Sequence, residues 1–260
     1  MMDTAQQRRN NVDERHESIS KEEKRIIIRP NGPYLVKGGI PLVRKTQVVS
    51  ENGEPLTWKK ECTDKTEEEY TLCRCGQSGA KPMCDGTHRK IKWDGTETAN
   101  TAPGTQFELT FNPTTNIVVT KNPELCMEAG FCGLRDATLA DLVASSDDPK
   151  IRSLIAAMVE RCPSGALTYH FEPGEPDIEP DLPAQVADTT EITSDGPIAG
   201  PLWVTGGIPI ERADGEPFET RNRVTLCNCG KSSNKPLCDG THRHEAQRLG
   251  RKRKQINQSR

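Results

Sequence analysis

Three cysteines and one histidine occur within sixteen residues in the segment CRCGQSGAKPMCDGTH, from Cys73 to His88. The same residue types recur at the same spacing in CNCGKSSNKPLCDGTH, from Cys227 to His242. Thiolate and imidazole are donors that bind zinc and iron in tetrahedral sites. The sequence therefore predicts two metal centres, with the donors Cys73, Cys75, Cys84 and His88 in the first and Cys227, Cys229, Cys238 and His242 in the second.

The spacing leaves two kinds of centre open. Zinc held by three cysteines and a histidine would be a structural staple without redox activity. Zinc sites usually separate paired cysteines by two to four residues, whereas C-x-C at a strand end places two spread sulfurs on the same side. Such a pair suits one iron of a larger cluster. Asp85 and Gly86 suit a helix start, which would place Cys84 and His88 one turn apart.

The ten cysteines could instead form a secreted disulfide framework. The N-terminal segment has no apolar run typical of a signal peptide, and no transmembrane helix is recognisable. We therefore expect a cytoplasmic protein, in which clustered thiols bind metal more often than they pair. The net charge of -3 does not favour nucleic-acid binding by the chain as a whole.

Both segments resemble the signature of the CDGSH iron-sulfur (mitoNEET-related) family. The matching residues between the ligands are Ser78, Pro82 and Thr87 in the first copy and Ser232, Pro236 and Thr241 in the second. The resemblance implies a 2Fe-2S cluster in each motif, held by the three cysteines and the histidine. In that family two units interlock through swapped β segments, so two units in one chain imply an internal pseudo-dimer.

The histidine ligand has a chemical consequence of its own. A neutral imidazole in place of a thiolate makes the ligand set less negative, which raises the reduction potential. Protonation of the outer nitrogen of His88 or His242 would weaken that ligand. We expect centres that are redox-active, sensitive to pH and releasable.

The blocks around the two motifs repeat each other: GPYLVKGGIPL at Gly32 matches GPLWVTGGIPI at Gly200. Each copy is expected to form short strands joined by Gly-Pro turns. These strands are predicted at 34–36 and 70–73 in the first copy and at 202–205 and 223–227 in the second. The first copy carries two extra loop insertions, one of them KKECTDKTEEE. Cys62 in this insertion is expected to be a free surface thiol.

A different module lies between the repeats. FELTF and NIVVT predict two strands joined by the turn NPTTN, and ALTYHF predicts a third. DDPKIRSLIAAMVERCP predicts a helix that Asp148 caps and Pro163 ends. The module is expected to be a small α+β unit.

The central module contains Cys126, Cys132 and Cys162 in the segments ELCMEAGFCG and CPSGAL. This arrangement is similar to half of a ferredoxin with Ala129 at the middle cysteine position, and the segment resembles the divergent mono-cluster ferredoxin domain. Three cysteines suit a 3Fe-4S cluster, or a 4Fe-4S cluster with a non-cysteine fourth ligand such as Glu128. The alternative is a cluster-free domain with buried thiols.

The expected organisation is α+β, with two CDGSH-type modules as an internal pseudo-dimer around a ferredoxin-like domain. It comprises a disordered arm at 1–24, the first module at 25–104, the central domain at 105–171, an acidic Pro-rich linker at 172–197, the second module at 198–245 and a disordered basic tail at 246–260.

We predict a multi-cluster iron-sulfur protein for one-electron transfer, with redox sensing or cluster transfer as extensions. Its partner would be an unidentified redox protein, with no membrane and no nucleic acid, and the chain would be a monomer. We expect a non-enzymatic electron carrier or redox accessory protein and not an enzyme, because the sequence contains no phosphate loop, nucleophile elbow or dinucleotide fingerprint. One alternative is a zinc-stabilised interaction module without redox activity. Another is nucleic-acid association through the basic C-terminal arm, which lacks interleaved aromatic residues.

Overall fold

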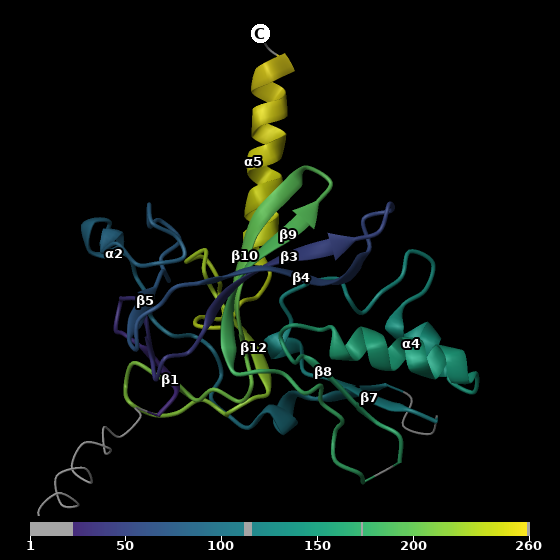
Figure 1. The fold of residues 1–260 in the computed structure, drawn as a ribbon. Coiled ribbons are helices and arrows are strands. Elements are labelled where there is room, and N and C mark those ends of the chain that lie inside the picture. The colour runs from purple at the N-terminus through teal and green to yellow at the C-terminus, as the bar shows by residue number, and fades with distance from the viewer. Residues whose placement is uncertain (1–22, 112–115, 173, 259–260) are drawn as a thin grey trace, which may run out of the picture.

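The computed structural model describes residues 23–111, 116–172 and 174–258, with side chains up to residue 249. The arm expected at residues 1–24 lies almost wholly outside this range. The described chain forms three β-sheets and few helices, which confirms the expected α+β class (Figure 1). Within the described part, no helix has both the length and the apolar character needed to cross a membrane.

Two of the sheets combine strands from both repeats. The first has the order β11-β1-β2-β5 and consists of β11 (Ile210–Glu211), β1 (Arg25–Ile28), β2 (Tyr34–Lys37) and β5 (Tyr70–Leu72). The second has the order β12-β10-β9-β3-β4 and consists of β12 (Arg223–Leu226), β10 (Gly196–Thr205), β9 (Gln185–Thr193), β3 (Leu42–Val49) and β4 (Pro55–Asp64).

Each repeat lends one strand to the other repeat's sheet. β11 of the second repeat pairs in parallel with β1, and β3 of the first pairs in parallel with β9. The exchange is symmetrical in detail: Ile26 N donates to Pro209 O and Val186 N donates to Pro41 O, each at 2.9 Å. The repeats therefore interlock as an internal pseudo-dimer.

The strand exchange places both repeats around one apolar core. Ile26, Val36 and Leu42 of the first repeat belong to the same buried cluster as Leu202 and Val204 of the second. The central domain joins this cluster through residues such as Ile117, Val143 and Ile155. Since small modules bury too little surface to be stable alone, the shared core replaces the one that each repeat lacks.

The prediction of an extended linker at 172–197 is wrong for the second half of this segment, because Gln185–Thr193 forms β9. Val186 and Ala187 are fully buried on this strand. β9 pairs with β10 as β1 pairs with β2, so the second repeat begins before residue 198. The acidic and proline-rich composition of the surrounding segment concealed a strand that only the partner strands stabilise.

The prediction of a disordered tail at 246–260 is also wrong for the described residues. They form the C-terminal portion of helix α5 (Thr241–Gln258). Figure 1 shows α5 projecting from the body of the molecule. The helix begins inside the second motif, where Thr241 N donates to Asp239 Oδ1 at 3.0 Å. Residues with high helix propensity then continue it, and Arg248 pairs with Glu245 one turn earlier.

The insertion KKECTDKTEEE is not entirely a loop, because its first residues up to Asp64 belong to β4. The strands β3 and β4 form a hairpin whose turn contains Gly53 at a φ of 82°. β4 is mostly exposed, as expected of an edge strand. Cys62 is exposed and free, as predicted.

The central domain has the predicted strands and helix. Its sheet contains β6 (Leu109–Phe111), β7 (Val118–Lys121) and β8 (Leu167–His170), and its helices are α3 (Leu139–Ala144), α4 (Pro149–Glu160) and the 3-10 helices η1 (Gly104–Phe107) and η2 (Pro123–Leu125). Asp148 caps α4 by accepting from Lys150 N at 2.8 Å. Helix α3 was not predicted, although Thr138 and Asp141 form a capping box at its start. Most of the predicted turn NPTTN lies outside the described residues.

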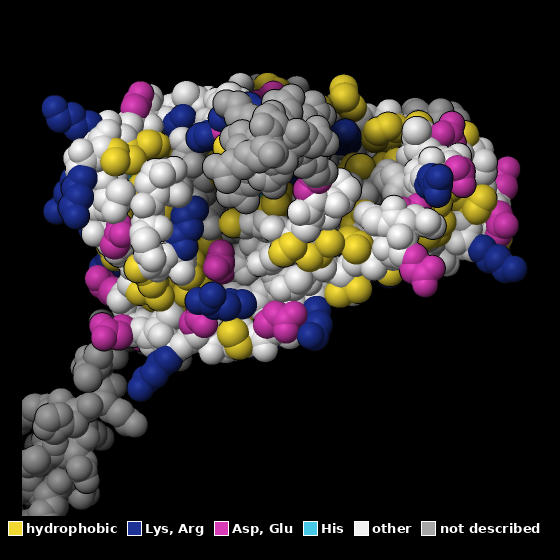
Figure 2. Space-filling view, turned by 90° about the horizontal axis from the view of Figure 1, so that it is seen from above, with side chains coloured by type: hydrophobic (Ala, Val, Ile, Leu, Met, Phe, Trp, Pro, Cys, Tyr) yellow, Lys and Arg dark blue, Asp and Glu magenta, His cyan; other side chains and the backbone are white. Residues whose placement is uncertain are grey.

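Charged side chains of both signs are mixed on the face of the molecule that is seen from above in Figure 2. Figure 2 shows lysine and arginine side chains interspersed with aspartate and glutamate on the visible face. This distribution agrees with a net charge of -3 and with the absence of a charge excess in the composition.

The two repeats approach closely at Gly76 and Gly230. A Cβ atom on Gly76 would overlap the carbonyl group of Cys229, and one on Gly230 would overlap that of Cys75. Both glycines also have a positive φ, of 76° and 74°. Only glycine fits at these equivalent positions, because any side chain would push the repeats apart.

We predict that Gly76→Ala destabilises the protein more than Gly53→Ala. Both substitutions incur the cost of a positive φ, about 1–2 kcal/mol, but Gly53 faces open space. The overlap with Cys229 should add about 1–3 kcal/mol at Gly76. Denaturant unfolding of both variants measures the difference, and equal losses of stability would contradict the close approach of the repeats.

Candidate metal centres

The first donor set follows strand β5. Cys73 and Cys75 come directly after the strand, and their Sγ atoms lie 3.9 Å apart. The loop returns along the strand, where Cys73 N donates to Pro82 O at 2.8 Å and Cys84 N donates to Thr71 O at 3.0 Å. These backbone bonds bring the third cysteine beside the C-x-C pair.

A tight turn brings the histidine to the third cysteine. Cys84 Sγ and His88 Nδ1 lie 3.4 Å apart. Helix α2 (Thr87–Lys90) begins only after Gly86, whose φ is 82°, so the two donors share a turn and not a continuous helix. Asp85 fixes the turn by accepting from Gly79 N at 2.8 Å and Thr87 N at 2.9 Å. These hydrogen bonds, chiefly from Thr87, hold the pKa of Asp85 well below its usual range.

The second donor set repeats this geometry. Cys227 and Cys229 have their Sγ atoms 3.7 Å apart, and Cys238 Sγ lies 3.4 Å from His242 Nδ1. Asp239 takes the role of Asp85, accepting from Ser233 N at 2.8 Å and Thr241 N at 3.0 Å. Burial alone would raise the pKa of Asp239, but the hydrogen bonds from Thr241 and Ser233 lower it to about 2.

Each donor set divides into two pairs of atoms. Two ligands of one tetrahedral ion, at about 2.0–2.3 Å from it, lie about 3.3–3.8 Å apart. The C-x-C pairs and the cysteine-histidine pairs have nearly this spacing, so each pair fits one metal ion. Among the described residues, no group of three or more His, Cys, Asp and Glu side chains is arranged to hold one metal ion. The donor sets thus fit a two-iron cluster with two protein ligands on each iron.

Backbone amides surround the sulfurs of the second set. The hydrogen bond from Cys229, together with the N–H groups of Ser232, Cys229 and Gly230, lowers the pKa of Cys227 to about 6 against the effect of burial. The same hydrogen bond raises the pKa of Cys229. Burial also raises the pKa of Cys238. A buried thiolate here needs either these amides or a cation for stability.

The outer edges of the two histidines have different surroundings. His242 Nε2 lies 3.0 Å from Oε1 of Glu191, a fully buried carboxylate on β9. His88 borders an open hollow, which we call the His88 hollow, lined also by Arg29, Glu69, Arg89, Lys92 and Trp93. Burial and then Arg89 lower the pKa of His88. Glu191 was not predicted as part of this site, because it lies 51 residues before His242 within the segment expected to be a linker.

The three cysteines of the central domain line one small cavity. Cys126, Cys132 and Cys162 come from two separate segments, and Ala129 also borders the cavity. Burial, followed by the neighbouring Cys162, raises the pKa of Cys132. The structure therefore brings together the three thiols predicted from the sequence.

The carboxylate of Glu128 contacts helix α5 and not the three cysteines. It borders the same cavity and has a φ of 60°, but its Oε2 lies 3.0 Å from His244 Nε2 on α5. Half of its side chain is exposed. Its carboxylate is thus paired with the helix that carries His242.

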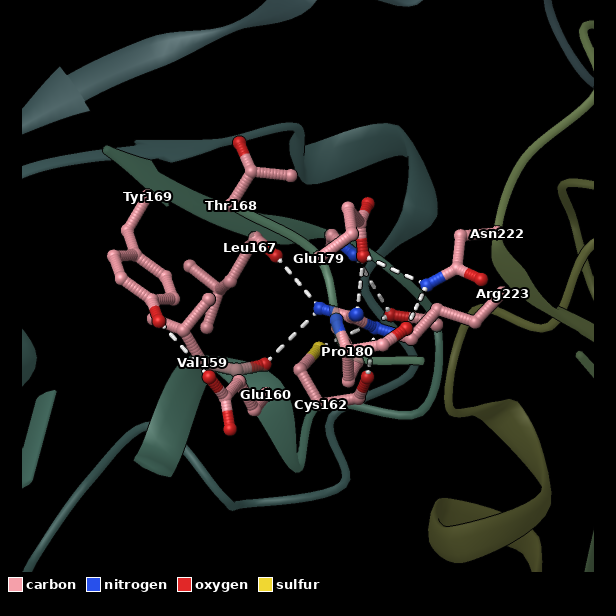
Figure 3. A network of polar contacts seen from close by, with 12 residues as sticks. Val159, Glu160, Cys162, Leu167, Thr168, Tyr169, Glu179, Pro180, Asn222 and Arg223 are labelled. Carbon is pink, nitrogen blue, oxygen red and sulfur yellow. Dashed lines mark hydrogen bonds and ion pairs between the residues drawn. The ribbon is translucent and has the colours of Figure 1, made fainter. Parts of the chain in front are cut away.

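A buried arginine connects the second repeat to the cysteine-bearing turn of the central domain (Figure 3). The Arg223 guanidinium donates to Cys162 O at 2.7 Å and to Val159 O and Leu167 O at 3.1 Å. It also pairs with Glu179. The arginine thus fixes the end of α4, the start of β8 and Cys162 between them.

Comparison with known families agrees with these three sites. Residues 31–89 and 199–243 match the family described as the iron-binding zinc finger of CDGSH type. Residues 114–172 match the family described as a divergent 4Fe-4S mono-cluster. No curated protein matches the chain. The matched segments contain the first, second and central donor sets in full.

We predict that Arg223→Met destabilises the protein by about 3–5 kcal/mol, since it leaves three buried carbonyls without their donor and Glu179 with Asn222 as its remaining partner. The matched control is Arg221→Met, which removes a surface pair with Glu219 and should cost less than about 1 kcal/mol. Thermal and denaturant unfolding measure both effects. Similar stabilities of the two variants would show that the Arg223 network does not hold the domains together.

Proposed function

Because the chain is a tandem CDGSH-type iron-sulfur protein with a divergent 4Fe-4S mono-cluster domain between its motifs, we propose that it carries single electrons to or from a redox partner protein. The observation that supports this most directly is the duplicated donor geometry. Each motif presents one cysteine pair and one cysteine-histidine pair, and the two donor atoms of each pair have the spacing of two ligands on one metal ion. A single structural zinc would need one point of convergence.

The ligands of the two CDGSH-type sites would divide between two irons. Cys73 and Cys75 would hold one iron of the first site, and Cys84 with His88 Nδ1 the other. In the second site the corresponding residues are Cys227, Cys229, Cys238 and His242. When bound, a 2Fe-2S cluster supplies reversible one-electron chemistry. The chain contributes burial of the thiolates and backbone N–H groups that stabilise their negative charge.

In the central site, Cys126, Cys132 and Cys162 would bind a cluster of three or four irons. Glu128 could act as a fourth ligand only by leaving His244. The central loop also contacts the second site, because Met127, Ala129 and Phe131 pack in one apolar cluster with Cys238. This contiguity supports a shared role in electron transfer.

Cluster transfer or redox sensing would use the same residues. The His88 hollow opens beside the first histidine, whereas His242 is covered by Glu191. Both histidines are themselves buried, each 7% exposed, so the difference is the solvent-filled hollow at the edge of His88, which offers protons to a ligand that protonation would release. This observation favours the first site as the one from which a cluster would be released.

We predict that anaerobically purified protein is red-brown and holds about four irons in the repeated sites and three or four in the central site. Cys84→Ser should lose about two of these irons with matching acid-labile sulfide. Cys62→Ser should lose none, because Cys62 is exposed on β4. Colourless protein with stoichiometric zinc and no sulfide would contradict the proposed function.

We also predict that His88→Cys and His242→Cys each lower the potential of the altered site, on the order of 100 mV or more, because a thiolate replaces a neutral ligand. Each variant should lose its cluster more slowly in mild acid, since the thiolate does not titrate as imidazole does. Potentiometric titration and the decay of visible absorption measure these effects. If both stayed as in the wild type, the histidines would not be ligands.

A further inference from the structure

A buried carboxylate covers the outer edge of the second histidine. Glu191 on β9 has no exposed surface, and its Oε1 lies 3.0 Å from His242 Nε2. Its other oxygen, Oε2, lies 3.3 Å from Arg243 Nη1. A glutamate this deeply buried requires partners that compensate its charge, and both partners belong to the start of α5.

This contact determines which nitrogen of His242 is free to bind metal. A carboxylate accepts hydrogen bonds and cannot donate them, so Nε2 carries the proton that points at Glu191. Nδ1 then has a free lone pair and faces Cys238 Sγ at 3.4 Å. A carboxylate behind a ligating histidine fixes the tautomer and makes the imidazole a stronger electron donor.

The first site lacks this arrangement. In the described part of the chain, His88 has no hydrogen bond or ion pair to a carboxylate. The His88 hollow contains the cations Arg29, Arg89 and Lys92, and its one acidic residue, Glu69, pairs with Lys37 at 2.5 Å. Asp85 and Arg89 of the first motif correspond to Asp239 and Arg243 of the second, but Lys231 stands where the first motif has Gln77. Lys231 is half exposed and pairs with Glu245, so its charge is compensated and screened by solvent.

One other difference between the motifs does not separate the sites. Arg74 stands between the first two cysteines where the second motif has Asn228. However, its guanidinium lies 5.6 Å from the ring of Tyr34, whose hydroxyl donates to Cys227 O at 2.9 Å. The charge of Arg74 therefore acts on both sites, whereas Glu191 is a fully buried charge that contacts only the second.

We propose that Glu191 is a positioning residue for His242 and that it gives the second site a lower reduction potential than the first. This inference rests on the proposed function. The carboxylate adds negative charge behind the histidine and strengthens its donation to the metal, and both effects favour the oxidised state. One electron given to the pair of sites therefore resides on the first site.

The test is a potentiometric titration of the full-length protein, monitored by electron paramagnetic resonance. His88→Cys and His242→Cys assign each signal to its site. We expect two potentials in the wild type, with the lower one belonging to the His242 site. Glu191→Gln should raise that potential alone, changing the equilibrium ratio of reduced first site to reduced second site by about tenfold, which equals about 59 mV.

The matched control is Glu245→Gln. Like Glu191→Gln, this substitution replaces a carboxylate by an amide, here on α5 three residues after His242. Glu245, however, is partly exposed and pairs with Lys231 and Arg248. It should leave both potentials unchanged. Equal shifts in the two variants, or no shift in Glu191→Gln, would overturn the role of Glu191.

If Glu191→Gln does not fold, the proposal is tested by comparing the reduction potentials of the two sites in the wild-type protein. Clusters present in both sites with equal potentials, or with the His242 site higher, would overturn this inference and leave electron transfer standing. Iron and sulfide missing from both sites would instead refute the proposed function itself.

Discussion

The exchange of strands between the repeats is the constraint on which the rest of the structure depends. Neither repeat completes a sheet alone, because β1 needs β11 and β9 needs β3. The C-x-C pairs follow β5 and β12, which lie at the ends of these two mixed sheets. The donor sets are therefore in place only when both repeats have folded together. Their positions are a property of the whole chain.

The exchange is symmetrical, but the strands that take part in it differ in length. β1 ends at Ile28, whereas β9 continues to Thr193. Glu191 lies in this additional part of β9, beyond the residues that pair with β3. Within the described residues of the first repeat, no corresponding strand extends to His88. A few additional residues in one strand thus bring to His242 a carboxylate that has no counterpart at His88 among the described residues.

The sequence allowed the donors to be predicted because their spacing is local. Cys73 and Cys75, or Cys84 and His88, are close along the chain, and short turns suffice to bring them together. The central helix was predicted for the same reason, since Asp148 and Pro149 mark its start and its apolar face follows the helical period. The interlocked arrangement came from the family resemblance and from the internal repeat.

Features that depend on distant partners were not predictable. β9 is a strand because β10 and β3 flank it, while its surroundings in the sequence are typical of a linker. Glu191 is buried only because α5 supplies His242 and Arg243. Arg223 gave no signal either, since its carbonyl partners belong to the central domain. In each case the stabilising groups come from another part of the chain.

Helix α5 gives His242 a mechanical connection to the surroundings of the molecule. His242 is the second residue of a helix of 18 residues, which is about 27 Å long. The helix leaves the body of the protein soon after this residue (Figure 1). A hydrogen-bonded helix transmits displacement along its axis, so a movement of the projecting part of α5 is passed to His242, the proposed metal ligand at its start. A force at the far end of α5 is thereby applied to the contact between His242 and Glu191.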